Sequence, residues 1–364
     1  MRSSDAIARL GGDEFVLLIQ EMNQPNPAAI VAQKILAAAT EPIILAGQAC
    51  RISASVGIAL FPEDGGDEVM LTKNADVAMY HAKQEGKNNY QFFSQNIKTQ
   101  SARRAALESN LRSAIERNEF SLHYQPKVDL LSDAITGAED LLRWKSPTLG
   151  EVAPADFLAV AEEMGLIIPV GLWTLRQACL DNMSWQREGI PPIREAVNLS
   201  LRRLSDDGLL RSIAEIQAET GMSAGLLELE ITETMVIHHP EVTIRLLSAI
   251  KQMGIRVAID DFGTGYALLR LLQQFPIDTL KTDRALVHDL KGQTDHQAIA
   301  ESMIAMGKTL STAAVAKGVE TIAQKNFLRD HGCEQMQGFY FSKALPADEF
   351  ARLMQRARPC LVAI

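Results

Sequence analysis

Polar and apolar residues alternate along a short segment near the middle of the chain. In the sequence Leu-Glu-Leu-Glu-Ile-Thr at 227–232, the leucines and the isoleucine share one face of an extended strand, while Glu228, Glu230 and Thr232 share the other. The apolar face is expected to pack beneath helices. The opposite face, with its two carboxylates, then points into the interior that the sheet encloses.

Short apolar segments of this kind recur along the chain, separated by segments with helical spacing. Between Val242 and Met253, apolar residues recur at helical spacing and Gly254 follows, which predicts a helix that ends there. Strand candidates lie around Leu122, Ala138, Ala196, Leu227, Val257, Leu280, Ala313 and Gly338. About eight strands alternating with helices predict an α/β fold with a closed (β/α)8 barrel.

The region before this barrel has a different pattern. Gly11-Gly12 lies between two apolar runs and predicts a tight hairpin, because glycine tolerates positive φ angles. An apolar run at 52–61 precedes a helical pattern at 75–83, and a polar stretch from Ser94 to Glu119 follows. We expect a first domain at 1–93, a helical linker at 94–112 and a second domain at 113–358.

The alternation places further polar side chains on the inner face of the barrel, near the ends of strands whose loops build barrel sites. They are Glu139, Arg143, Asn198, Asp260 and Lys281. A single inward carboxylate is more often a structural group than a catalytic one. Several acids around one mouth cannot all stay ionised without cations, because like charges raise one another's pKa. The acids concerned are Glu139, Glu230, Glu233, Asp260, Asp261 and Glu320.

Oxygen ligands together with the amide of Asn198 suit Mg²⁺ or Mn²⁺ rather than zinc. The neighbouring Asp260 and Asp261 can share two ions that lie roughly 3.5–4 Å apart, a spacing that clamps the attacking and leaving oxygens of a phosphodiester.

Composition narrows the classes of ligand and the compartment. A net charge of −9 argues against a groove for duplex DNA and against a polybasic membrane anchor. The four cysteines lie far apart, which fits a reducing cytosol. No apolar run approaches the roughly 18 residues that cross a bilayer. We expect a cytoplasmic chain whose longer parent could be tethered to a membrane.

Short motifs follow one another through the second region. They are Tyr124-Gln125-Pro126, Glu139-Asp140-Leu141-Leu142-Arg143-Trp144, Asn198-Leu199-Ser200, Glu230-Ile231-Thr232-Glu233, Asp260-Asp261-Phe262-Gly263-Thr264-Gly265, Lys281-Thr282-Asp283-Arg284, Gly318-Val319-Glu320 and Gln337-Gly338. In this order they resemble the EAL domain of bacterial cyclic-di-GMP phosphodiesterases. The sequence Gly11-Gly12-Asp13-Glu14-Phe15, with Tyr80, Lys83, Gly86 and Asn88, resembles the C-terminal half of a GGDEF, or diguanylate cyclase, domain.

The resemblance implies a modified TIM barrel in which two divalent cations hydrolyse cyclic di-GMP to linear pGpG, preceded by a truncated, palm-like α/β fragment. It implies a first metal held by Glu139, Asn198, Glu230 and Asp260, and a second by Asp260 and Asp261. The implied catalytic residues are Lys281, which positions or deprotonates the attacking water, Gln337 near that water, Glu233, which braces the 260–265 loop, and Glu320. The implied substrate-binding residues are Gln125, Leu141, Arg143 and Asp283. The same loop shapes a dimer contact in the family, which implies a homodimer.

Two positions depart from the family pattern. Asp140 replaces the alanine of the EAL motif and points outward beneath the helices, where an unpaired carboxylate is costly. We expect a basic group or a backbone donor to meet it.

The second departure is Lys317, where the family has a glutamate that serves the second metal. Alternation from Ala313 and Val315 places Lys317 inside the mouth. At 4 Å and an effective dielectric near 20, each unit-charge pair contributes about 4 kcal/mol, so the reversed sign should weaken the second metal strongly. We expect binding of cyclic di-GMP with hydrolysis slowed or absent. The alternative is that the long lysine side chain turns to solvent.

The first domain is incomplete, since the family draws its guanine pocket and a metal-binding aspartate from residues further upstream. We therefore expect no diguanylate cyclase activity. Arg2 and Asp5, at the spacing Arg-Ser-Ser-Asp ahead of Gly11, resemble the family's inhibitory product site.

Three classes of function remain. They are a metal-dependent phosphodiesterase weakened by Lys317, a catalytically silent cyclic-di-GMP receptor, and a purely structural dimerisation module. The structural module explains neither the carboxylates nor the two lysines of the mouth.

Overall fold

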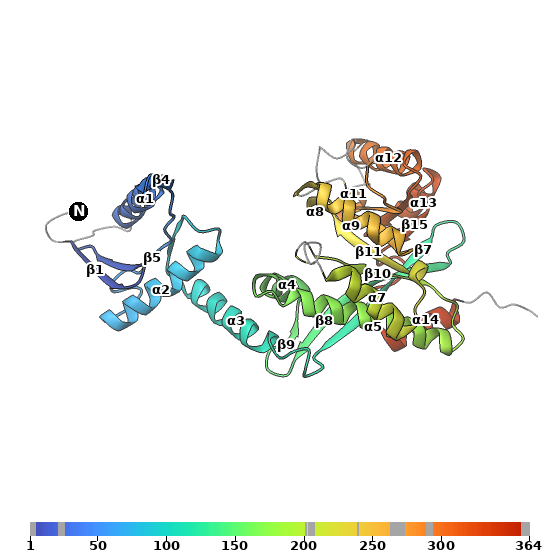
Figure 1. Ribbon diagram of the computed structural model, residues 1–364, viewed down its shortest axis with the longest axis horizontal. Helices are drawn as coiled ribbons and strands as arrows, with labels where there is room; N and C mark the ends of the chain where they lie inside the picture. Colours follow the sequence, from blue (N-terminus) through green and yellow to red (C-terminus); the bar gives the residue numbers. More distant parts are fainter. Residues whose placement is uncertain are drawn as a thin grey trace, which may run out of the picture. The chain divides into compact units, whose positions relative to one another are not determined.

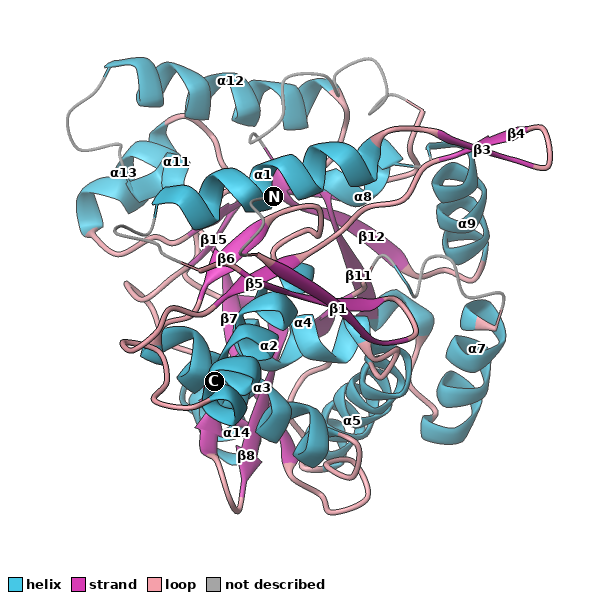
Figure 2. Ribbon diagram, turned by 90° about the vertical axis from the view of Figure 1, so that its left-hand side faces the viewer, coloured by secondary structure: helices cyan, strands magenta, loops and turns pink. Residues whose placement is uncertain are grey.

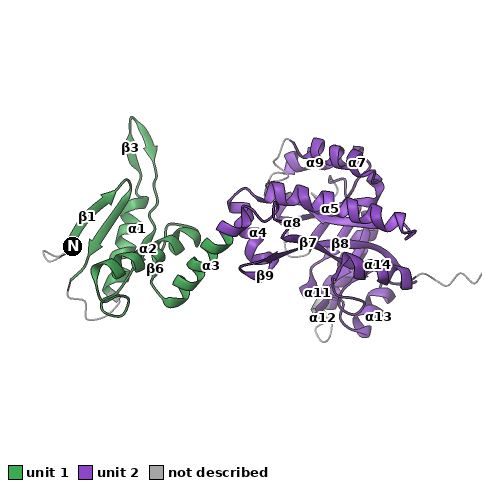
Figure 3. Ribbon diagram, turned by 90° about the horizontal axis from the view of Figure 1, so that it is seen from below, with its two compact units in different colours: residues 1–107 green, residues 108–364 purple. Residues whose placement is uncertain are grey.

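The computed structural model describes residues 5–20, 26–200, 202, 208–238, 240–262, 274–288 and 294–357 of the 364-residue chain. The chain divides into two compact units, Met1–Leu107 and Glu108–Ile364 (Figure 3). No described helix is both long enough and apolar enough to span a membrane.

The first unit combines three short sheets with helices. Its elements, continuing to the helix that leads into the second unit, are β1 (Ala6–Gly11), β2 (Glu14–Leu18), α1 (Asn26–Thr40), β3 (Ile43–Leu45), β4 (Gln48–Cys50), β5 (Val56–Ile58), α2 (Glu68–Gln84), β6 (Tyr90–Phe92) and α3 (Gln95–Leu111). The predicted hairpin forms between β1 and β2, and Gly12 turns it with a φ of 52°. Helix α2 begins where the Asp67 side chain accepts a hydrogen bond from the Met70 amide.

The second unit alternates strands and helices (Figure 1). Its elements are β7 (Phe120–Asp129), β8 (Ile135–Ser146), β9 (Gly150–Val152), α4 (Pro154–Glu163), α5 (Ile167–Arg187), β10 (Arg194–Asn198), α7 (Leu209–Thr220), η1 (Ala224–Leu226), β11 (Leu227–Thr232), α8 (Glu233–His238), α9 (Pro240–Gln252), β12 (Arg256–Phe262), β13 (Thr279–Thr282), α11 (Arg284–His288), α12 (Thr294–Thr309), β14 (Ala313–Lys317), α13 (Ile322–Asp330), β15 (Gln335–Gln337), β16 (Leu345–Pro346) and α14 (Ala347–Arg356).

Eight of the described strands close into a barrel. The order is β7-β8-β10-β11-β12-β13-β14-β15, and β15 pairs with β7 again. Six neighbouring pairs, from β8–β10 to β14–β15, are parallel, but β7 runs antiparallel to both β8 and β15. The predicted (β/α)8 barrel is thus confirmed in a modified form, with one reversed strand.

Strand β8 is longer than the barrel wall needs. Residues 137–140 pair with β10, whereas the strand continues to Ser146 and there pairs with β7 and β9. Glu139 therefore lies in the wall itself, and Arg143 lies four residues further along, about 13 Å away at the rise of a strand. This differs from the expectation that both residues end their strand at the mouth.

Apolar outer faces of the strands pack under helices, as the alternation predicted. Figure 2 shows α7, α9, α12 and α13 outside the barrel strands. Over β7, β14 and β15, the buried Val128, Ala316 and Met336 share one apolar cluster with Ile304 of α12 and Leu328 of α13. This packing leaves the inner faces for polar side chains.

Candidate functional site

Three buried carboxylates converge inside the barrel from strands β8, β11 and β12. Glu139, Glu230 and Asp260 each offer an oxygen within 4.8 Å of the others. The strand register aligns Asn198 with Glu230, so the Asn198 amide lies on the next strand at the same level. Its Nδ2 donates to Glu139 Oε1 at 3.2 Å.

Lys281 of β13 lies among these carboxylates and is completely buried. Its Nζ lies 2.7 Å from Glu139 Oε2, 2.5 Å from Glu230 Oε2 and 3.8 Å from Asp260 Oδ1. Burial lowers the pKa of Lys281, but attraction to Glu139, Glu230 and Asp260 outweighs it and raises that pKa well above the ordinary value. Lys281 is therefore an ammonium group at neutral pH and acts here as a donor.

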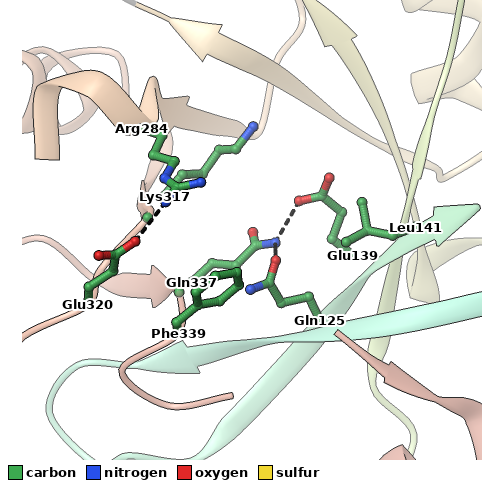
Figure 4. Close-up of a pocket in the computed structure, with 10 residues that line it drawn as sticks. Gln125, Glu139, Leu141, Arg284, Lys317, Glu320, Gln337 and Phe339 are labelled. Carbon is green, nitrogen blue, oxygen red and sulfur yellow. Dashed lines mark hydrogen bonds and ion pairs between the residues drawn. The ribbon is translucent and has the colours of Figure 1, made fainter. Parts of the chain in front are cut away.

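Gln337 holds the second oxygen of Glu139 and is itself held by Gln125 (Figure 4). Gln337 Nε2 donates to Glu139 Oε2 at 2.7 Å and to Gln125 Oε1 at 3.0 Å. Burial raises the pKa of Glu139, yet the charges of Lys281 and Lys317 more than compensate and lower it. Glu139 is thus held as a carboxylate.

Lys317 of β14 points into the mouth and bridges the two consecutive aspartates. Its Nζ lies 2.8 Å from both Asp260 carboxylate oxygens and 2.9 Å from Asp261 Oδ1. Neighbouring strand residues normally face opposite ways. Here Asp261 has a φ of 52° and lies in an irregularity of the β12–β13 ladder, so its carboxylate can also turn toward the ammonium group.

A second layer of polar residues lies beneath the mouth. Lys127 Nζ lies 2.7 Å from Glu228 Oε1 and 2.9 Å from Glu230 Oε1, and Thr279 Oγ1 donates to Glu228 Oε2 at 2.8 Å. All of these side chains are buried. Sequence reasoning recognised Glu228 as inward-facing but omitted Lys127. Period-two spacing from Gln125 was a signal that could have found it.

A cavity opens beside Glu139 and Lys317 at the rim of the barrel. It is lined by Gln125, Glu139, Leu141, Arg284, Lys317, Gly318, Glu320, Gln337, Gly338 and Phe339. Arg284 Nη2 pairs with Glu320 Oε1 at 2.7 Å, and its guanidinium carbon lies 5.8 Å from the centre of the half-exposed Phe339 ring. Arg284 and Phe339 were not among the expected site residues.

Other expected site residues lie away from this cavity lining. Arg143 donates to the carbonyl of Leu142, beyond the barrel wall. Asp283 Oδ1 accepts from the Ala285 amide at the start of α11. Glu233 is buried at the start of α8, directly after β11, while most of the loop it was expected to brace, residues 263–265, lies outside the described residues. Asp5 directly precedes β1, and Arg2 lies outside the described residues.

The structure corrects the expectation that a basic group or a backbone donor meets Asp140. The side chain does point outward and is buried, but the Glu195 carboxyl lies beside it. Burial and the Glu195 charge raise the pKa of Asp140 well above its usual range, and burial raises the pKa of Glu195 to about 7. Asn182 Nδ2 donates to Glu195 Oε1 at 3.0 Å. With its pKa raised in this way, Asp140 can share a proton with Glu195, and no described basic group or backbone donor contacts its carboxyl oxygens.

The donor set fits one divalent ion. Three carboxylate oxygens and an amide oxygen suit a hard cation such as Mg²⁺. The second position fits an ion less well, because it has only the Asp260 and Asp261 carboxylates, one of them shared with the first position, and the Lys317 ammonium group contacts both. Four acids and two ammonium groups meet in the mouth and leave two negative charges, the amount that one divalent ion neutralises.

Comparisons with known families agree with this architecture. A family model described as EAL domain matches residues 108–344, and one described as diguanylate cyclase, GGDEF domain, matches residues 1–89. The bifunctional diguanylate cyclase/cyclic di-GMP phosphodiesterase MucR of Pseudomonas aeruginosa is 40% identical over 349 residues, which cover 96% of this chain and 51% of MucR. The cyclic di-GMP phosphodiesterase PdeR of Escherichia coli is 34% identical over 356 residues, 98% of this chain and 53% of PdeR. The chain thus spans about half the length of these relatives.

Solved structures show the same barrel. The MucR phosphodiesterase in complex with c-di-GMP matches with a TM-score of 0.65 at 38% identity, covering 67% of this chain and 99% of that one. The FimX EAL domain of Pseudomonas aeruginosa bound to c-di-GMP matches with a TM-score of 0.60 at 26% identity, covering 66% of this chain and 96% of that one.

Proposed function

Because the chain belongs to the EAL domain family, we propose that it binds cyclic di-GMP at the barrel mouth and hydrolyses it slowly to linear pGpG. The observation that carries this proposal is the contact of Lys317 with both Asp260 and Asp261, beside an acidic cluster that fits one divalent ion. Relatives and solved EAL domains named for this nucleotide support the choice of ligand.

Glu139, Asn198, Glu230 and Asp260 would hold the ion, Mg²⁺ or Mn²⁺. When bound, the ion supplies Lewis-acid polarisation of the phosphodiester. Lys281 remains an ammonium group among the carboxylates and positions the attacking water by donating to its oxygen. Gln337, fixed between Glu139 and Gln125, places an amide beside the same space.

Lys317 supplies a fixed positive charge where the family has an acidic ligand. The ammonium group lines the cavity and can donate to a phosphate oxygen, which favours binding of an anionic nucleotide. It cannot activate the leaving oxygen as a divalent ion does, because it carries half the charge and its donors already contact Asp260 and Asp261. Binding is therefore retained while hydrolysis is slow.

The cavity rim suits the bases of the ligand. Phe339 presents an aromatic face that can stack on a purine, and Arg284 and Glu320 form an ion pair next to it. Gln125 and Leu141 also line the cavity (Figure 4).

The second candidate is a receptor that binds cyclic di-GMP without turnover, which the same Lys317 contact favours. Two measurements on one sample separate the candidates: calorimetric titration of cyclic di-GMP with and without Mg²⁺, and chromatography of the mixture for pGpG. Binding with slow Mg²⁺-dependent release of pGpG supports the weakened enzyme. Binding without any pGpG supports the receptor. No binding in either condition contradicts both.

We further propose that the protein acts as a cytoplasmic homodimer paired through the EAL barrel and has no diguanylate cyclase activity. Light scattering of the purified chain tests the dimer, which a monomeric mass at micromolar concentration would contradict. Incubation with GTP tests the cyclase, since any cyclic di-GMP formed would contradict the proposal.

A further inference from the structure

Glu230 is held at both ends by lysine side chains that reach it from opposite levels of the barrel. Lys281 contacts its Oε2 at 2.5 Å in the mouth, and Lys127 contacts its Oε1 at 2.9 Å from below. Lys127 is in turn held by Glu228 at 2.7 Å. Lys127 and Glu228, which we call the floor pair, lie too deep to line the described cavity.

The reversed strand explains how Lys127 comes to lie there. On β7, Gln125 and Lys127 share the inner face, and the register aligns Gln125 with Glu139 and Lys127 with Gly137. Because β7 runs against β8, the residue two positions after Gln125 lies deeper in the barrel. The parallel strand β11 has Glu228 two positions before Glu230, so Glu228 lies at the same depth.

We propose that Lys127 is a positioning residue for the metal ligand Glu230. The inference rests on the proposed function, which takes Glu230 as a ligand. Lys127 binds one oxygen of Glu230 and Lys281 binds the other, which fixes the direction of the carboxylate beside Glu139 and Asp260. A ligand whose direction is fixed before the ion arrives loses no side-chain freedom on binding.

The geometry of the floor pair distinguishes this role from simple charge balance. Lys127 and Glu228 cancel each other's charge, and Thr279 holds the second oxygen of Glu228 at 2.8 Å. Removing both charges leaves the net charge of the barrel interior unchanged. What such a change removes is the hydrogen bond that Lys127 donates to Glu230 Oε1.

Two double variants test the proposal. Lys127→Met alone would leave Glu228 buried without its cation and could fail to fold, so Glu228→Gln accompanies each change at position 127. Lys127→Met/Glu228→Gln removes the donor to Glu230, whereas Lys127→Gln/Glu228→Gln carries the same net charge and retains an amide donor. Lys325→Met is a remote control, because it removes a 2.5 Å ion pair with Asp133 outside the site.

The readout is the affinity for Mn²⁺ alone, measured by the electron paramagnetic resonance signal of the free ion, with thermal unfolding to confirm that each variant is folded. We expect the Met double variant to bind Mn²⁺ about 10- to 100-fold more weakly than the wild type. The Gln double variant should recover part of that loss, and Lys325→Met should match the wild type.

Equal Mn²⁺ affinity of the Met and Gln double variants, or a Met double variant that binds as tightly as the wild type or more tightly, would overturn the positioning role. A wild-type chain that binds no Mn²⁺ would instead overturn the metal site of the proposed function. The two failures are therefore distinguishable.

Discussion

At the scale of single residues, Lys317 decides the charge of the mouth. With lysine there, two negative charges remain among the contacting groups, whereas glutamate would leave four. We expect Lys317→Glu to bind two Mn²⁺ ions where the wild type binds one, and to release pGpG at least about tenfold faster, a barrier change of about 1.4 kcal/mol. Ion titration and chromatography measure the two effects.

The control for this prediction is Lys317→Met, which removes the positive charge without supplying a ligand oxygen. It should not acquire the turnover of Lys317→Glu. Two Mn²⁺ ions bound to the wild type, or wild-type turnover equal to that of Lys317→Glu, would contradict the role given to this residue.

Asp140 and Glu195 predict a stability that depends on pH. Burial raises both pKa values above those of the unfolded chain, and the Glu195 charge raises that of Asp140 further, so the folded state binds protons more tightly. The contribution of Asp140 and Glu195 to the free energy of unfolding is fully present below about pH 4. It is lost as the pH rises through about 7, where Glu195 ionises. Asp140→Ala should therefore raise the free energy of unfolding by about 1–3 kcal/mol at pH 8 and by less at pH 5.

Urea denaturation at the two pH values checks this expectation. Asp140→Asn is the matched control, because it keeps the size of the side chain and can donate to Glu195 without titrating. Turnover should survive in both variants, since Asp140 points away from the mouth. A folded Asp140→Ala variant that has lost pGpG formation would show that the residue acts on the site.

At the scale of elements, the end of β12 sets the direction of two carboxylates. Asp261 adopts a left-handed conformation in which a Cβ atom costs about 1–2 kcal/mol, although Asp, Asn and Gly tolerate it better than other residues. We expect Asp261→Ala to be less stable than Asp261→Gly by about 1 kcal/mol, with Asp261→Asn close to the wild type. Chemical denaturation of the three variants measures the difference, and equal stabilities would mean that the bulge relaxes.

Strand alternation accounts for how much of the barrel and its mouth could be predicted. It is a local property, so the inward faces of β11, β12 and β13 and the convergence of Glu230, Asp260 and Lys281 follow from the sequence. The reversal of β7 depends on pairing with distant strands, and it places Lys127 at the depth of Glu228. Alternation gives the face on which Arg143 lies but does not say how far β8 extends past the wall.

The contacts that a side chain makes were harder to predict than the face of the strand on which it lies. The alternation placed Lys317 inside, but its contact with both aspartates depends on the backbone conformation of Asp261. For Asp140, the outward face was predicted correctly and the partner was wrong, because Glu195 comes from the neighbouring strand β10 and nothing local indicates an acid there. The roles of the site residues stay predictions.

At the scale of the whole molecule, every residue that lines the described cavity belongs to the second unit. We expect residues 108–364 alone to bind cyclic di-GMP with the affinity of the full chain, because the first unit contributes no side chain to that lining. Calorimetry of both proteins in the same buffer makes the comparison. A loss of affinity beyond about tenfold, or 1.4 kcal/mol, would show that the first unit acts on the barrel.

The ammonium group of Lys317 is a counterion that is covalently attached to the protein. A dissolved ion occupies its site according to its concentration, and a site that needs two ions empties with the square of that concentration when magnesium is scarce. A tethered charge cannot be diluted or removed by a chelator. The affinity of this barrel for the nucleotide should accordingly vary with the free magnesium concentration to the first power at most. It should also persist at magnesium concentrations at which a barrel that needs two ions would release its ligand.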